Sequence, residues 1–136
     1  MKYDLGIDVK GLVFGAAIAA AFIILGWQIN DWLYPFSAIG LLYAGYAQKN
    51  LKIGTFIGAF ASTPIIVLTF QGYLGQFSGF FVTEPGMITV TLIILLVGAF
   101  VGFVGAWTKR ARVKAKEEYE KKQKIGKNKN KKKNKK

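Results

Sequence analysis

The sequence contains no cysteine and no histidine, and only 7 of its 136 residues are acidic. These absences exclude disulfide bonds, zinc sites built from Cys and His, cysteine nucleophiles and histidine-based acid–base catalysis. The glycine-rich phosphate-binding motifs of nucleotide enzymes are also missing. We therefore expect a protein that is not an enzyme and that holds neither a metal ion nor another cofactor.

Positive charge is abundant but confined to one end of the chain. The net charge is +12 at pH 7, although 52% of the residues are hydrophobic. Residues 109–136 carry 15 Lys and Arg against 3 Glu, whereas residues 1–108 carry 4 Lys and 4 acids. The chain thus divides into a neutral, apolar body and a cationic tail, and charge repulsion does not oppose compaction of the body.

Four uncharged, apolar runs divide the body. An α-helix rises about 1.5 Å per residue and the bilayer core is about 30 Å thick, so about 20 apolar residues cross it. Four such runs leave no polar faces for solvent, which argues against a soluble protein. We predict an all-α, polytopic membrane protein with four transmembrane helices packed as two hairpins. The spans are expected at about 11–30, 32–48, 53–71 and 87–108.

The charged loops predict the orientation of these spans. Lys49 and Lys52 lie between the second and third spans, and the basic tail follows the fourth, whereas the other two connections carry only Asp31 and Glu84. Lysine and arginine favour the cytoplasmic side of a membrane. We therefore expect a multi-pass protein of the cell membrane with both its N-terminus and its C-terminus in the cytoplasm.

Two features around the third run predict irregular structure. Pro64 lies in the middle of the span and should kink the helix, with Ser62 or Thr63 satisfying the freed backbone groups. The following segment, residues 70–87, is rich in aromatic residues and glycine. Such a segment is expected to lie in the outer membrane interface, either as an anchor or as a docking patch for a partner.

Small residues occur four positions apart in every span. Lipid provides no hydrophobic drive between helices, so small residues hold helices together by allowing close backbone approach. Two compatible interpretations remain open, namely packing inside a compact four-helix bundle and packing against a second copy of the chain. The predicted helix-packing residues are Gly11, Gly15, Gly40, Ala44, Gly54, Gly58, Gly98, Gly102 and Gly105.

The tail is expected to begin as a helix. Three Glu residues each precede a Lys by four positions, an arrangement that stabilises helices, so we predict a cytoplasmic helical extension over residues 109–125 that ends at Gly126. The remainder, residues 126–136, consists mainly of Lys and Asn and is expected to be disordered.

The start of this extension is strongly basic. One Lys or Arg near an anionic leaflet contributes about 1 kcal/mol of attraction. Protein docking and contact with nucleic acid or the ribosome are alternatives, but no aromatic residue interleaves the final lysines, so any nucleic-acid contact would involve phosphates alone and would not be specific. The residues expected to contact anionic lipid are Lys109, Arg110, Arg112, Lys114 and Lys116.

Three glycine-rich stretches carry a family resemblance. They are IGLLYAGY at 39–46, KIGTFIGA at 52–59 and VGAFVGFVG at 97–105. The pattern resembles a glycine-rich, four-helix membrane domain of unknown function that is frequent in archaea. The resemblance covers most of residues 11–108 and implies the same fold. It supplies no catalytic residues, and the lysine-rich tail lies outside it.

Composition and pattern together lead to three hypotheses about function. The first is a non-enzymatic integral membrane protein, structural or an accessory subunit of a membrane complex, whose partners are membrane lipids and either a second copy or another subunit. The second is a holin-like pore-former, which this chain resembles in its small size, few spans and basic C-terminus. The third is a small-solute channel or transporter, although the spans contain no ionisable residue that would mark an ion path.

Overall fold

The computed structural model describes residues 6–73 and 83–133, the stretch 125–133 by its backbone alone. The described part is almost entirely helical and contains no β-strand. Three helical segments are long and apolar enough to cross a membrane, namely Val9–Gln28, Leu51–Phe70 and Glu84–Lys124. The prediction of an all-α protein is confirmed for the described residues, and three of its helices have the length and apolar character that a membrane span needs. That these helices cross a membrane, the fourth span and the orientation stay predictions.

The first helix, α1, covers Val9–Gln28 and begins at a side-chain cap. Asp8 Oδ1 accepts a hydrogen bond from the Gly11 N–H at 3.0 Å and so satisfies one of the free N–H groups of the first turn. The next helical segment also begins at a side-chain cap, Asn30, whose Oδ1 accepts a hydrogen bond from the Trp32 N–H at 3.1 Å. Because this second cap follows α1 directly, the connection to the next helical segment is tight.

The second predicted span consists of two segments rather than one regular α-helix. A 3-10 helix, η1, covers Asp31–Phe36, and α2 covers Ser37–Ala47. Pro35 lies inside η1. Its ring would clash with the carbonyl four residues earlier in an α-helix, and it has no N–H to donate, which favours the tighter winding. The prediction of a span over 32–48 therefore differs from the structure in the winding of its first five residues.

The third predicted span is interrupted beside Pro64. Helix α3 covers Leu51–Ala61 and α4 covers Thr63–Phe70. Ser62 lies between them, and its N–H and its Oγ both donate to the Ala59 carbonyl, at 3.2 and 2.6 Å. Hydrogen bonding thus continues through the interruption, which lies where the sequence predicts a kink.

The last helix, α6, covers Glu84–Lys133 and is 50 residues long. It joins the fourth predicted span to the basic extension without a break. The predicted end at Gly126 is wrong, and the backbone over 126–133 is helical rather than disordered. One interior glycine costs only about 1 kcal/mol relative to alanine, whereas lysine is a good helix former and is stabilised near the negative end of the helix dipole. Residues 134–136, and 74–82 of the predicted interfacial segment, lie outside the described part.

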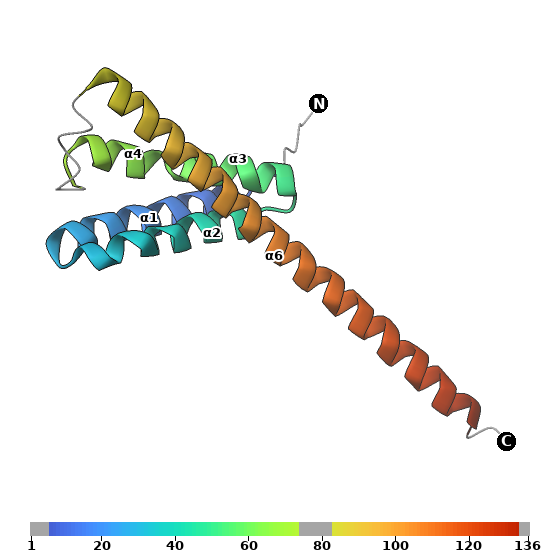
Figure 1. Cartoon of the computed structure of the whole chain (residues 1–136). Helices are drawn as coiled ribbons and strands as arrows, with labels where there is room; N and C mark the ends of the chain where they lie inside the picture. Colours follow the sequence, from blue (N-terminus) through green and yellow to red (C-terminus); the bar gives the residue numbers. More distant parts are fainter. Residues whose placement is uncertain (1–5, 74–82, 134–136) are drawn as a thin grey trace.

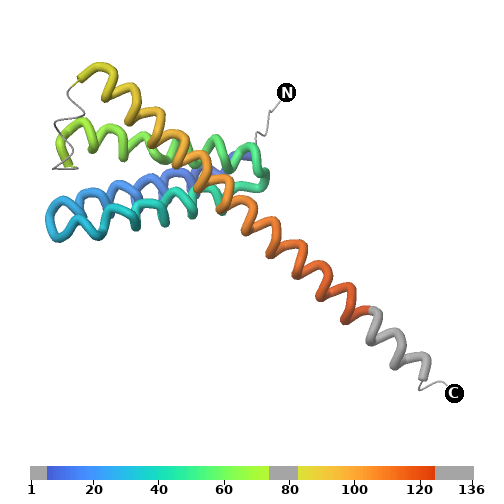
Figure 2. Tube along the Cα trace, in the orientation of Figure 1, coloured from blue at the N-terminus to red at the C-terminus, as the bar shows by residue number. Residues whose placement is uncertain are grey.

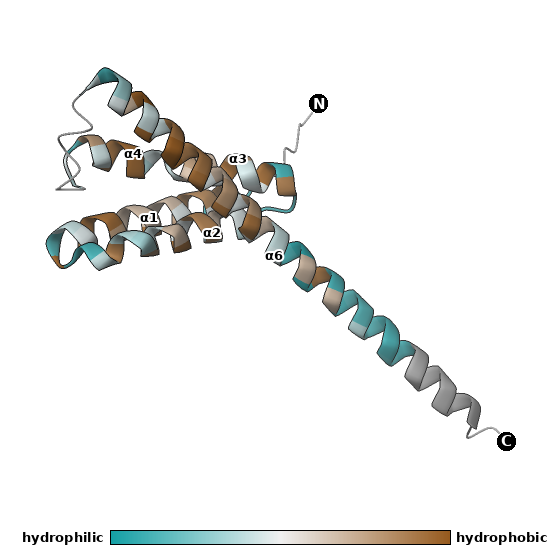
Figure 3. Ribbon diagram, viewed as in Figure 1, coloured by the Kyte–Doolittle hydropathy of each residue, from teal (hydrophilic) through white to brown (hydrophobic). Residues whose placement is uncertain are grey.

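The helices form two pairs that meet where α2 crosses α6. Helix α1 packs along α2, and α3 packs along α6 (Figure 1, Figure 2). Helix α6 runs obliquely across the others, and its C-terminal half projects away from them (Figure 1). Figure 3 shows that α6 changes from apolar to hydrophilic where it leaves the other helices. The boundary between body and tail in the sequence is therefore also the boundary of the helix bundle.

The core of this bundle is small, while its outer surface is strongly apolar. Several large side chains lie on the outside, among them Trp32 at 80% and Phe56 at 72% exposure. In water such a surface would be unfavourable, but it matches a hydrocarbon environment. The buried core residues are mostly small or medium-sized: Ala19, Ile23, Leu41, Ala44, Ile57, Ala61 and Ile65.

Candidate functional site

All of the predicted helix-packing residues are buried, and they lie at three helix crossings. The first crossing joins α1 to α2. A Cβ added to Gly15 would lie 2.5 Å from the Cβ of Ala44, and one added to Gly40 would lie against the backbone of α1. A Cβ added to Gly11 would lie still closer to the Cβ of Ala47. Larger side chains at these glycines would force the two helices apart.

The second crossing joins α3 to α6. A Cβ added to Gly58 would lie 2.6 Å from Gly102 Cα, and one added to Gly102 would lie 2.6 Å from Gly58 Cα. A Cβ on Gly98 would lie 2.8 Å from the Ser62 hydroxyl oxygen, and Gly54 meets a methyl group of α6. Backbone therefore packs directly on backbone along this crossing.

The third crossing joins α2 to α6 and links the two helix pairs. A Cβ added to Gly105 would lie 2.8 Å from the backbone N of Tyr46, and one added to Gly45 would lie 2.6 Å from Gly102 Cα. Gly45 is not among the predicted packing residues, because neither residue four positions away from it is small. Gly102 contacts both α2 and α3, so three helices meet at this residue.

A polar cluster ties the start of α1 to the end of α2. The Asp8 N–H donates to Gln48 Oε1 at 2.8 Å, and Gln48 Nε2 donates to the carbonyls of Asp8 and Ala44, both at 3.1 Å. Gln48 is only 1% exposed, and these bonds satisfy both ends of its amide. Gln48 is not a predicted site residue, because in the sequence it is only a lone glutamine at the end of the second predicted span.

The basic extension is anchored to the same end of α2. Lys109 Nζ donates to the Ala47 carbonyl at 2.7 Å and lies 5.8 Å from the centroid of the Tyr46 ring. Arg112 Nη1 lies 3.5 Å from the Tyr46 hydroxyl. A cation at the C-terminus of a helix opposes the negative end of its dipole, so Lys109 stabilises α2. Two of the five predicted lipid-contacting residues therefore have partners within the chain.

The other three predicted lipid-contacting residues are Arg110, Lys114 and Lys116. All three side chains are exposed, and the three residues lie in the part of α6 that follows the apolar body. Exposed cations at this place can approach anionic headgroups without first leaving an internal partner. The lipid contact predicted for the extension thus depends mainly on these three residues.

Hydroxyl groups in the apolar helices bond to their own backbone. Thr55 Oγ1 donates to the carbonyl four residues earlier at 3.0 Å, Thr69 at 2.7 Å, and Thr89 and Thr91 at 2.8 Å. Such bonds satisfy a hydroxyl without a partner from another helix. Within the described residues, every buried side-chain N and O atom has a partner, and no group of three Asp, Glu, His or Cys could hold a metal ion.

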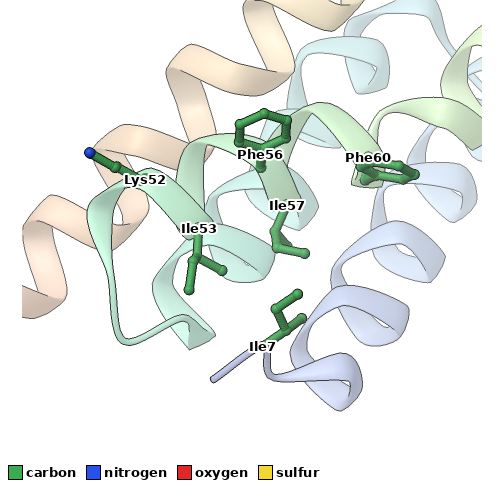
Figure 4. Close-up of a pocket in the computed structure, with 6 residues that line it drawn as sticks. All are labelled: Ile7, Lys52, Ile53, Phe56, Ile57 and Phe60. Carbon is green, nitrogen blue, oxygen red and sulfur yellow. The ribbon is translucent and has the colours of Figure 1, made fainter. Parts of the chain in front are cut away.

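An apolar pocket of about 290 Å³ lies beside α3 (Figure 4). Two isoleucines and two phenylalanines of α3 contribute to it, together with one residue from the segment before α1. Its lining offers a hydrocarbon surface with a single charged group. The lining residues are Ile7, Lys52, Ile53, Phe56, Ile57 and Phe60.

A scan against protein-family models, a search of curated proteins and a search of solved structures find no match to this chain. The resemblance to the glycine-rich archaeal membrane domain therefore stays a prediction. What is established is that the described residues fold almost entirely into helices, of which three segments are long and apolar enough to cross a membrane.

Proposed function

We propose that this chain is a non-enzymatic, four-span protein of the cell membrane that is structural or an accessory subunit of a membrane complex. The observation that carries this proposal is the low burial of α6. In the most apolar stretch of 18 residues in α6, only 11% is buried within the chain. The corresponding share is 28% in α1 and 39% in Leu51–Phe70. A long apolar helix that leaves so many residues of this stretch unburied in its own bundle is suited to contact a neighbouring subunit.

One ridge of large side chains runs along the N-terminal, apolar part of α6. Ile88, Leu92, Leu96 and Phe100 follow one another at four-residue intervals and are 63%, 54%, 69% and 68% exposed. Ridges of this spacing pack into the grooves of a neighbouring helix. Gly98, Gly102 and Gly105 of α6 face its own bundle, so the ridge is available to lipid and to a helix of another chain.

The fourth span in this proposal is η1 together with α2. A 3-10 helix rises about 2.0 Å per residue and an α-helix about 1.5 Å, so 6 and 11 residues extend about 28 Å together. This is close to the hydrocarbon thickness of about 30 Å. With four spans, Lys49, Lys52 and the basic extension share one side, and Asp31 and Glu84 share the other. Both termini are then cytoplasmic, in accord with the positive-inside rule.

Contacts at the two ends of the bundle support this arrangement. Gln48 and Lys109 belong to the cluster at the basic end. At the opposite end, the Tyr34 hydroxyl donates to the Tyr73 carbonyl at 2.8 Å, and the Trp27 ring packs edge-on against Tyr73 with centroids 5.2 Å apart. Aromatic side chains with a polar tip favour the membrane interface. The aromatic end is thus suited to the outer interface and the basic end to the inner one.

A holin-like pore-former and a small-solute channel or transporter are the alternatives. The glycine crossings favour the subunit role over both, because helices in backbone contact leave no space between them for a water-filled path. The threonine hydroxyls also bond to their own helices instead of aligning along a path. The basic extension, through Arg110, Lys114 and Lys116, would add contact with the anionic leaflet to the subunit role.

The proposal is tested by purifying the full chain from its native membrane in mild detergent. We expect a complex larger than the single chain. The double variant Leu92→Ala and Leu96→Ala should release the partner, since loss of two interface side chains typically costs a few kcal/mol in all, or about 100-fold in affinity.

Phe14→Ala is the matched control, because Phe14 is 65% exposed on α1, away from the ridge. It should leave the complex intact. A strictly monomeric chain, or release by the control as readily as by the ridge variant, would contradict the subunit role. Ion or dye release from proteoliposomes above the level of empty vesicles would favour a pore instead.

A further inference from the structure

We propose that the pocket beside α3 binds one anionic phospholipid of the inner leaflet, with a hydrocarbon chain along the phenylalanines and the phosphate at Lys52. The site is distinct from the subunit role and from the basic extension, because it uses neither the ridge on α6 nor any residue of the extension. It rests on the proposed function in one respect. The Lys52 end of α3 has to lie at the cytoplasmic headgroups for an inner-leaflet lipid to reach it.

Helix α3 carries a stripe that matches one lipid in polarity and in length. Lys52, Phe56 and Phe60 follow one another at four-residue intervals and so share a face of the helix (Figure 4). Phe56 and Phe60 are 72% and 66% exposed and stand out from the bundle. The distance along the helix from Lys52 to Phe60 is about 12 Å, close to the roughly 15 Å that one leaflet contributes to the hydrocarbon core.

The pocket also has a floor and an opposite wall. Ile53 and Ile57 form the floor, and Ile57 is only 5% exposed. Ile7 points toward Ile57 from the segment before α1 (Figure 4). Ligand pockets begin at about 300 Å³, so a volume of about 290 Å³ holds part of one chain rather than a whole lipid. A chain held on several sides is more firmly placed than lipid on an open helix surface.

The charges around the pocket favour an anionic headgroup. Lys52 is exposed in the first turn of α3, and Lys49 lies in the loop before it. None of the six lining residues is acidic. Asp8 follows Ile7 in the chain, but its carboxylate accepts the Gly11 N–H as the cap of α1. A phosphate near Lys52 would therefore gain a charge-assisted contact, whereas a zwitterionic headgroup would bring a second cation to the same place.

Native mass spectrometry of the full chain tests this site. The chain is released from micelles that contain equal amounts of phosphatidylglycerol and phosphatidylcholine with matched acyl chains. We expect one retained phosphatidylglycerol in preference to phosphatidylcholine. Lys52→Gln should lower that preference about fivefold, the factor that one lysine contributes at an anionic surface. Lys49→Gln, a neighbouring lysine outside the lining, should change it less than twofold.

A second pair of variants examines the hydrocarbon side. Phe60→Ala should lower the retention of both lipids about threefold or more, because it removes apolar contact without disturbing a buried core. Phe14→Ala, which removes an equally exposed ring from α1, should leave retention unchanged. Equal effects of Lys52→Gln and Lys49→Gln, or equal retention of the two lipids by the unchanged chain, would overturn the proposal.

Two further outcomes would also overturn it and identify another occupant. Loss of retention in a variant with Arg110, Lys114 and Lys116 changed to Gln, but not in Lys52→Gln, would locate the lipid on the extension and leave the proposed function intact. A dimer that dissociates on Phe56→Ala would show a second copy on this face. The orientation is tested separately by labelling, so lipid selectivity that persists with Lys52 found outside would contradict the orientation and not the lipid-binding chemistry.

Discussion

Replacing Gly102 with leucine is expected to open the helix bundle and to lower the free energy of unfolding by about 3 kcal/mol or more. A Cβ at Gly102 would already lie 2.6 Å from Gly58 Cα and 3.0 Å from its N atom. Both atoms belong to the backbone, so no rotamer change can relieve the clash. Gly45 of α2 packs against the same residue, so separating α6 from α3 would also separate it from α2.

The effect is measured by thermal or denaturant unfolding of the purified chain in detergent. Gly102→Ala should destabilise less than Gly102→Leu, because only one methyl group has to be accommodated. Ala21→Leu is the control, since Ala21 is exposed on α1 and the added side chain would face lipid. We expect a change below about 0.5 kcal/mol for this surface substitution. Equal stability of Gly102→Leu and Ala21→Leu would show that the glycine crossing does not hold the helices together.

Reversing three charges at the start of the extension is expected to release it from anionic membranes. The variant carries Arg110→Glu, Lys114→Glu and Lys116→Glu. These are the predicted lipid-contacting residues other than Lys109 and Arg112, which bond within the chain. Each cation contributes about 1 kcal/mol at an anionic leaflet, so the loss of three should by itself shift the equilibrium between surface-bound and free extension about 100-fold. Repulsion of the three introduced Glu adds to this shift. In 1 M salt the unchanged chain should behave similarly, because the Debye length falls to about 3 Å.

The measurement is energy transfer from a dye at Tyr119→Cys to labelled headgroups in phosphatidylglycerol and phosphatidylcholine nanodiscs. The control reverses Lys121, Lys122 and Lys124, which changes the same number of charges. These residues begin about 20 Å beyond Thr108 along the helix, well past the Debye length of about 8 Å at physiological salt. We expect less than a tenfold shift for the control. Equal shifts for the two variants, or no difference between the two lipids, would contradict a contact made by the first turns of the extension.

The long helices could be predicted because charge and apolar content mark their limits. The first span was expected at 11–30, and α1 covers Val9–Gln28 between the caps at Asp8 and Asn30. The winding of η1 could not be predicted in the same way, because a regular span and a 3-10 segment have the same hydropathy. It depends on Pro35 and on the hydrogen bonds of the turn. The continuation of α6 past Gly126 shows that one glycine is a weak stop signal in a lysine-rich helix.

The candidate site, too, could be predicted only in part from the sequence. Small residues four positions apart are visible in the sequence, and all of those predicted to pack helices are buried. Contacts between distant segments are not visible. Gln48 bonds to the backbone of Asp8 across 40 positions, and Lys109 bonds to Ala47 across 62. These partners are backbone groups, which leave no mark in the sequence, so the bond from Lys109 to the end of α2 could not be predicted. The lipid contact of Lys109 stays a prediction.

Four spans with both termini in the cytoplasm can be tested directly by cysteine labelling in intact cells. The chain has no cysteine of its own, so a single introduced cysteine reports only its own position. Asp31, Lys49 and Lys124 are exposed and mark the first turn, the second loop and the extension. We predict that a membrane-impermeant maleimide labels Asp31→Cys in intact cells, and Lys49→Cys and Lys124→Cys only after permeabilisation. Labelling of Asp31→Cys and Lys49→Cys from the same side would show that η1 and α2 do not cross the membrane and would contradict the four-span topology.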